Sequence, residues 1–153
     1  MKPSTSRRLE TAGHCSVLLL PKGANGRALC RWCSVEVVRP RLTFCSDACI
    51  HEWKIRTQPN YAKLQVAKRD DGICQLCRVD TMAAIRPRHL HNDKHTSRAL
   101  SSFDMDHIVP VVEGGGACGL DNLRTLCRPC HRAVTAELAK RRAAARRAAG
   151  GKP

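Results

Sequence analysis

The stretch FDMDHIVPVVEGGGACGLDNLRTLCRPCHRA, residues 103–133, decides the fold that we predict for this chain. Its first ten residues are rich in Val and Ile, which predicts a strand over 103–112, and three glycines then interrupt that strand. A short return strand is expected over 122–126. Good helix formers dominate residues 128–149, which predicts a helix, and Pro129 suits its first turn. The stretch therefore indicates two strands followed by a helix.

Two further helices are expected before this stretch. Ser46 can cap a helix over 47–53, and Asn60 can cap another over 61–69. Asp71 and Gly72 are typical of a helix end, because glycine adopts the left-handed conformation without a steric penalty. With the two strands, these helices predict a small α+β protein.

The composition of the chain favours an anionic partner and a thin hydrophobic core. There are 27 Lys and Arg residues against 13 Asp and Glu, a formal net charge of +14 at pH 7 over 153 residues. A field of this size favours polyanions, most plausibly nucleic acid. Aromatic residues make up only 3% of the chain, so an additional stabilising element is expected.

Cysteine pairs are the expected stabilising element. Eight of the ten cysteines form close pairs, which are Cys30/Cys33, Cys45/Cys49, Cys74/Cys77 and Cys127/Cys130. Such spacing lets both sulfurs face one tetrahedral Zn2+. The run SVLLLP at 16–21 is too short for a signal core or a membrane span. We therefore expect a cytoplasmic protein of a bacterial or phage-infected cell, without a membrane partner, in which thiols bind metal instead of oxidising.

The pairs combine into two predicted zinc sites, about two structural Zn2+ ions per chain. The first comprises Cys30, Cys33, Cys45 and Cys49, and the alternative is two unrelated buried thiol pairs or a site in which His51 replaces one cysteine. The second comprises Cys74, Cys77, Cys127 and Cys130, whose halves lie about fifty residues apart. Structural zinc contributes folding free energy, on the order of 10 kcal/mol in small peptides.

The polar residues of the opening stretch suggest a second kind of metal site. His131 follows the zinc-binding Cys130 directly, so the structural metal would fix its position. We expect Asp106 and His131 to bind one divalent cation and His107 to act as a general base. A regular strand places Asp106 and His107 on opposite faces, so a bend near Pro110 would be needed. The side chain of Asn122 would hold the loop backbone.

These motifs resemble the HNH endonuclease family, in its four-cysteine zinc subclass. The resemblance rests on Asp106-His107-Ile108-Val109-Pro110, the glycines, Asn122-Leu123 and Cys127-x-x-Cys130-His131. The longer pattern from RWCSVEVVRPRLTFCSDACIHEWKIRT to RDDGICQLC is similar to small bacterial and phage HNH proteins and to the nuclease domain of a eukaryotic annealing helicase.

The resemblance has specific structural and functional implications. It implies a zinc-stabilised ββα-metal, treble-clef-like core and cleavage of DNA phosphodiester bonds. His107 would be the general base. Asp106 and His131 would bind the catalytic divalent cation, which we expect to be Mg2+ or Mn2+. Asn122 would complete the catalytic set.

Four segments are predicted along the chain: a basic arm over 1–28, an N-terminal four-cysteine zinc module over 29–58, a nuclease domain over 59–137 and a basic helix and tail over 138–153. His89, His91 and His95 form a loose cluster, interpreted as a solvated loop that touches DNA or, alternatively, as a third metal site. The basic run KRRAAARRAA over 140–149 is interpreted as a phosphate contact, and its alternative is a solvated helix.

Two other functions stay open at this point. A non-catalytic zinc-finger DNA-binding protein would share the zinc sites and the basic charge. It would have no need to align Asp106, His107 and His131. A nuclease that works only within a larger DNA-processing assembly is also compatible with the sequence.

Overall fold

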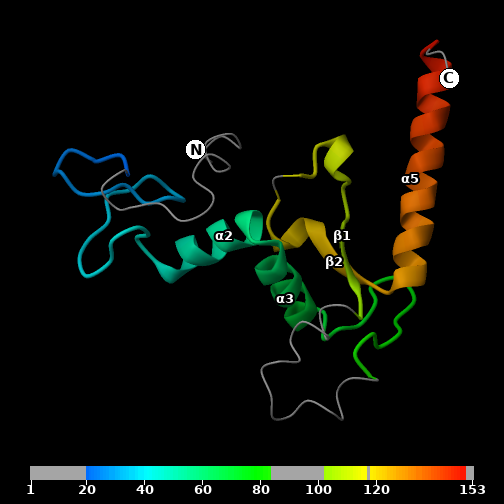
Figure 1. The fold of residues 1–153 in the computed structure, drawn as a ribbon, viewed down its shortest axis with the longest axis horizontal. Coiled ribbons are helices and arrows are strands. Elements are labelled where there is room, and N and C mark those ends of the chain that lie inside the picture. Colours follow the sequence, from blue (N-terminus) through cyan, green and yellow to red (C-terminus); the bar gives the residue numbers. More distant parts are fainter. Residues whose placement is uncertain (1–19, 84–101, 117, 151–153) are drawn as a thin grey trace. The chain divides into compact units, whose positions relative to one another are not determined.

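Three α-helices and one two-stranded antiparallel sheet make up the regular structure of residues 20–83, 102–116 and 118–150, which this computed structural model describes (Figure 1). Two short 3-10 helices, η4 (Val111–Glu113) and η5 (Leu120–Asn122), complete the described elements. The predicted α+β class is confirmed. Most of the basic arm, the histidine cluster over 89–95 and the last three residues lie outside the described ranges.

The chain forms two units, and each is described here by itself. Unit 1 draws on Met1–Gln65 and Val109–Asn122, and unit 2 draws on Val66–Ile108 and Leu123–Pro153. The division into four segments made from the sequence stays a prediction.

Unit 1 is organised around helix α2 (Asp47–Thr57). The Ser46 side chain accepts a hydrogen bond from the Cys49 N–H at 3.2 Å, which confirms it as the N-cap. The helix continues past the predicted residue 53 as far as Thr57. Cys30, Val37 and Cys49 are buried together, so the thiols are part of this unit's core.

Helix α3 (Pro59–Arg69) begins two residues earlier than predicted. A proline is tolerated in the first turn, because the N–H that it lacks would have no partner within the helix. Asp71 and Gly72 adopt left-handed φ values of 53° and 69°, which confirms the predicted helix end.

The sheet of unit 2 is shorter than the predicted hairpin. Strand β1 (Asp104–His107) pairs antiparallel with strand β2 (Leu123–Leu126), and the two lie side by side in Figure 1. The prediction of a strand as far as residue 112 was wrong. Pro110 has no N–H to continue a ladder, and residues 111–113 form η4 instead. The placement of Asn122 in the return strand was also wrong, since it ends η5.

Helix α5 (Arg128–Ala148) follows β2 after Cys127 and confirms the predicted C-terminal helix. Pro129 occupies its first turn. The helix buries no residue completely, and its second half, shown in red in Figure 1, is solvated except for the half-buried Ala143. Among the described residues, no helix combines the length and the apolar composition needed to cross a bilayer.

Candidate active site and cysteine clusters

The first cysteine cluster lies in unit 1. The sulfur atoms of Cys30, Cys33, Cys45 and Cys49 all lie within 4.8 Å of one another. Cys45 precedes α2 and Cys49 lies one turn inside it, so both sulfurs face the same point, 3.4 Å apart. This is the set expected from the x3 spacing, and four converging thiols form a donor set that can hold a metal ion such as zinc.

The second cluster lies in unit 2 and joins segments fifty residues apart. Its sulfur atoms also lie within 4.8 Å of one another, and they belong to Cys74, Cys77, Cys127 and Cys130. The sulfurs of Cys77 and Cys127 are 3.6 Å apart. All nine cysteines in the described part of the chain are free thiols, so these four are available as ligands.

One thiol in each cluster is prepared to ionise. Although burial raises its pKa, backbone N–H groups of Cys127, Cys77 and Leu76 lower the pKa of the Cys74 thiol to about 6. Burial also raises the pKa of the Cys30 thiol, but hydrogen bonds from backbone N–H groups outweigh burial and lower that pKa to about 7. Because thiolate is the metal-binding form, Cys74 and Cys30 favour the charge state that zinc requires. The opposite holds for Cys130, whose pKa is raised to about 12 by its hydrogen bonds with the Cys127 and Cys77 thiols.

The two acids of β1 share one face of the strand. Side chains alternate along a strand, so Asp104 and Asp106 project to one face and His107 to the other. Asp106 lies opposite Arg124 of β2, and its Oδ2 accepts from Arg124 Nε at 2.9 Å, with Arg124 Nη2 at 2.8 Å. Both guanidinium contacts use Oδ2, so Arg124 leaves Asp106 Oδ1 unengaged. The bend at residues 108 and 109 begins after His107, so it does not bring His107 to the strand face of Asp106 as the sequence analysis expected.

His131 lies at the start of α5 and faces a carboxylate of β1. Its backbone N–H donates to the Cys127 carbonyl at 2.9 Å, so the second cysteine cluster fixes its backbone. Its Nδ1 lies 3.2 Å from Oδ2 of Asp104. The predicted partner was Asp106, whereas the recorded contact is with Asp104, two residues earlier on the same strand face.

Asn122 holds the loop between the strands, within unit 1. Its Oδ1 accepts from the Val109 N–H at 2.7 Å, and its Nδ2 donates to the carbonyls of Val109 and Gly115 at 3.0 and 3.1 Å. A Cβ at position 115 would overlap the Val109 carbonyl oxygen and crowd Asn122 Nδ2, so only glycine fits there. The expectation that the Asn122 amide binds loop backbone is confirmed, and it fixes the segment directly after His107.

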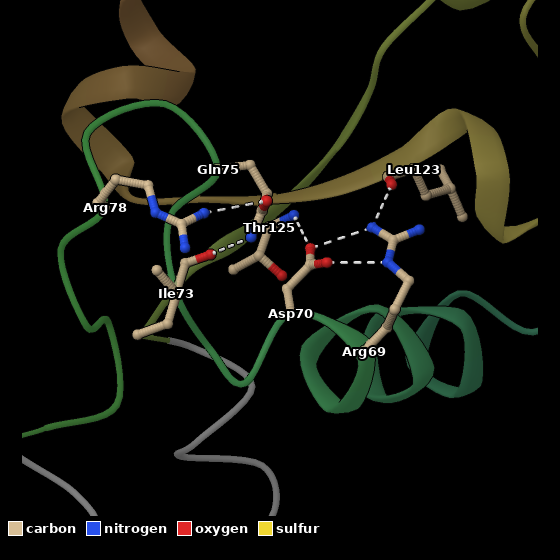
Figure 2. A network of polar contacts seen from close by, with 7 residues as sticks. All are labelled: Arg69, Asp70, Ile73, Gln75, Arg78, Leu123 and Thr125. Carbon is tan, nitrogen blue, oxygen red and sulfur yellow. Dashed lines mark hydrogen bonds and ion pairs between the residues drawn. The ribbon is translucent and has the colours of Figure 1, made fainter.

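A polar network that the sequence analysis missed holds the outer edge of β2 (Figure 2). The buried carboxylate of Asp70 accepts from the Thr125 N–H at 2.8 Å and from Arg69 Nε at 2.8 Å. Arg69 also donates to the Leu123 carbonyl at 2.7 Å, and the Gln75 N–H donates to the Thr125 carbonyl at 2.9 Å. The end of α3 and the loop of Cys74 are thereby bonded to the strand that leads to Cys127.

Arg124, Asp104 and the Arg69–Asp70 pair were all absent from the predicted site. The alternation of a strand was the available signal for Asp104, because it lies two residues before Asp106. The hairpin register, which pairs Asp106 with Arg124, was not evident from the sequence.

The comparisons with known proteins identify the class. Residues 89–137, which include every candidate catalytic residue, match the family model described as HNH endonuclease. The chain therefore carries a nuclease domain of the HNH endonuclease family.

The relatives are much longer proteins. The chain is 33% identical over 154 residues to the mouse (Mus musculus) protein "DNA annealing helicase and endonuclease ZRANB3", which covers 80% of this chain and 14% of that protein. The human protein of the same name is 35% identical over 127 residues, covering 68% of this chain and 12% of that protein. The chain thus spans about one seventh or less of these curated relatives.

One solved structure is also similar. The crystal structure of the human ZRANB3 HNH domain is 31% identical and covers 57% of this chain and 95% of that chain, with a TM-score of 0.39.

Proposed function

We propose that this protein is a metal-dependent endonuclease that hydrolyses phosphodiester bonds of DNA. Asp106 and His131 would bind the catalytic divalent cation, His107 would be the general base, and each cysteine cluster would hold one structural zinc ion. The observation that carries the proposal is the position of His131. The second cysteine cluster fixes its backbone, and its ring contacts the strand face that carries Asp106.

The available donor atoms suit a divalent cation. Carboxylate oxygen and imidazole nitrogen are ligands that Mg2+ or Mn2+ accepts, and a site with few protein ligands leaves positions for water and phosphate. Arg124 holds Oδ2 of Asp106, which favours presentation of Oδ1 as the ligand atom. When bound, the cation would supply charge stabilisation to the phosphate oxygens and to the leaving oxygen.

The protein's own groups would perform the remaining tasks. A ring nitrogen of His107 would take the proton from a water molecule as the water oxygen attacks phosphorus. Asn122 would hold the loop that follows His107, because it bonds both backbone groups of Val109. The exposed arginines of α5 would bind substrate phosphates and position the DNA without reading its sequence.

Supercoiled plasmid provides the direct test. The zinc-loaded chain should nick plasmid in the presence of Mg2+ or Mn2+, and brief chelation should stop nicking reversibly while about two zinc ions per chain remain bound. Harsher removal of the thiolate-bound zinc should unfold the protein. Plasmid binding without nicking in either metal would contradict the proposal and favour the non-catalytic zinc-finger alternative.

A further inference from the structure

We propose that Asp104 is a positioning residue for His131. Its carboxylate would accept a hydrogen bond from Nδ1–H of the imidazole, so that Nε2 keeps its lone pair and is free to bind a cation. The inference deepens the proposed function, because it assigns a task to a residue outside the predicted catalytic set.

The two carboxylates of the β1 face have different partners. Asp106 is engaged by Arg124 through Oδ2, whereas Asp104 Oδ2 lies 3.2 Å from His131 Nδ1. Asp104 is therefore the acid that faces the imidazole. Both side chains of the Asp104–His131 pair are 35% exposed, so the pair is partly shielded from water while an open side remains for a ligand.

The second cysteine cluster does not determine the orientation or the tautomer of the His131 imidazole. The cluster and the first turn of α5 fix the backbone of His131, but its side chain can still rotate and its proton can lie on either nitrogen. In a neutral imidazole, the hydrogen bond made by one nitrogen determines which nitrogen is free to bind a metal. A carboxylate against Nδ1 selects the form with the proton on Nδ1 and the lone pair on Nε2.

The strength of this effect can be anticipated. Carboxylates that orient a metal-binding histidine are worth about 10- to 100-fold in metal affinity or activity when removed. A surface ion pair without such a task contributes little to stability and would leave cation affinity unchanged. Cation affinity and the imidazole tautomer thus separate a positioning role from a merely structural one.

The experiment compares Asp104→Ala and Asp104→Asn with Glu137→Gln in the full zinc-loaded chain. Glu137 is an exposed acid of the same helix as His131, so its variant removes one negative charge as a matched control. Long-range 1H–15N NMR at a pH where imidazoles are neutral reports the tautomer, with the His131 signal assigned by its loss in His131→Gln. Mn2+ affinity is measured by electron paramagnetic resonance.

In the wild type, the His131 proton should lie on Nδ1. Asp104→Ala should produce a mixture of tautomers and weaken Mn2+ binding by about 10- to 100-fold, whereas Glu137→Gln should change neither. Asp104→Asn keeps an acceptor oxygen, so its tautomer ratio and its Mn2+ affinity should lie between those of the wild type and of Asp104→Ala. Circular dichroism and zinc content confirm that each variant is folded.

Two results would overturn the inference. One is a wild-type His131 with its proton on Nε2, and the other is an unchanged tautomer in Asp104→Ala, even if Mn2+ binding is lost, since Asp104 would then be a direct ligand. Failure of the proposed function is distinguishable. If wild-type protein binds no Mn2+, the function fails, while the tautomer still decides whether Asp104 orients His131.

Discussion

The two cysteine clusters share one local design but have different surroundings. In each, the first cysteine has a lowered pKa and the second pair lies at the start of a helix. A histidine follows the last cysteine in both. His51 of unit 1 bonds through Nδ1 to the Tyr61 hydroxyl at 2.9 Å, whereas His131 of unit 2 faces the carboxylate of Asp104.

Under the proposed function, this difference would distinguish a purely structural cluster from one that also positions a catalytic residue. Around the first cluster, Arg31 lies over the rings of Phe44 and Trp53, so that module is consolidated by aromatic packing. Next to the second cluster, a strand carries two acids on one face, and a histidine follows the last cysteine directly. The four thiols in each place can hold a metal ion, and next to the second set the imidazole of His131 faces the carboxylate of Asp104 at 3.2 Å.

The largest expected effect comes from removing a ligand of the second cluster. Cys127→Ser should lower the zinc content by about one ion per chain and unfold unit 2, since structural zinc is worth on the order of 10 kcal/mol. Plasmid nicking should disappear with it. Elemental analysis and circular dichroism provide the measurements.

Cys45→Ser is the matched variant in the first cluster. It should also cost about one zinc ion, but the disruption should be centred on unit 1, where the fluorescence of Trp32 and Trp53 reports it. If Cys127→Ser or Cys45→Ser keeps both zinc ions, the cluster that contains the substituted cysteine is not a zinc site.

The second effect concerns the histidines. His107→Ala should lower the nicking rate by about 10²- to 10⁴-fold, the usual contribution of a general base. Zinc content and DNA affinity should be nearly unchanged, because His107 would bind neither structural zinc nor the cation.

His51→Ala is the control from the other cluster. It removes the bond to Tyr61 and should leave the nicking rate close to that of the wild type. Nicking by His107→Ala at the wild-type rate would show that another group activates the water.

A smaller effect is expected from the network at the edge of β2. Asp70→Asn should destabilise the protein by about 1.5–3 kcal/mol, the usual value for hydrogen bonds to a charged group. Burial raises the pKa of Asp70, but hydrogen bonds from Arg69 and from the Thr125 N–H outweigh it, and the net shift is downward.

The direction of that shift predicts the pH dependence. A lowered folded-state pKa means that the contribution of Asp70 is complete above its unfolded value, about 3.9, and is lost as the pH falls through the lower folded value. Urea unfolding of the wild type and of Asp70→Asn should therefore differ by a constant amount from pH 8 to pH 5. A difference that shrinks between pH 7 and pH 5 would contradict the lowered pKa.

Local features of this protein were predictable from sequence, and long-range partners were not. The cysteine pairs, the Ser46 cap and the end of α3 depend on residues within a few positions of one another, where spacing determines geometry. The joining of Cys74 and Cys77 with Cys127 and Cys130 was the one long-range prediction, and it rested on the four ligands that tetrahedral zinc requires. The length of β1 was overestimated because valines at 111 and 112 favour a strand, although Pro110 cannot continue the ladder. The partners of Asp106 and His131 depend on strand register and on how α5 leaves the second cluster, and the Asp70–Thr125 bond joins residues 55 positions apart.

The smallest expected effect concerns the basic C-terminal half of α5. Helix α2, which carries Cys49 of the first cluster, has no such extension. Helix α5 carries seven basic residues and one acid, and its last turns are solvated. If these arginines bind phosphates, each contact adds about 0.9 to the slope of log affinity against log salt on duplex DNA.

The test variant replaces four residues with Gln: Arg141, Arg142, Arg146 and Arg147. A control of equal charge replaces four exposed residues elsewhere: Lys22, Arg27, Arg39 and Lys68.

The α5 variant should flatten the salt slope and weaken binding to all sequences alike, more than the control does. Turnover of bound substrate should change little, because these side chains lie two or more turns beyond His131 and contact no reacting group. Equal slopes for wild type and the α5 variant would show that this half of α5 is a solvated helix. A loss restricted to one DNA sequence would instead indicate base recognition, because phosphate contacts carry no sequence information.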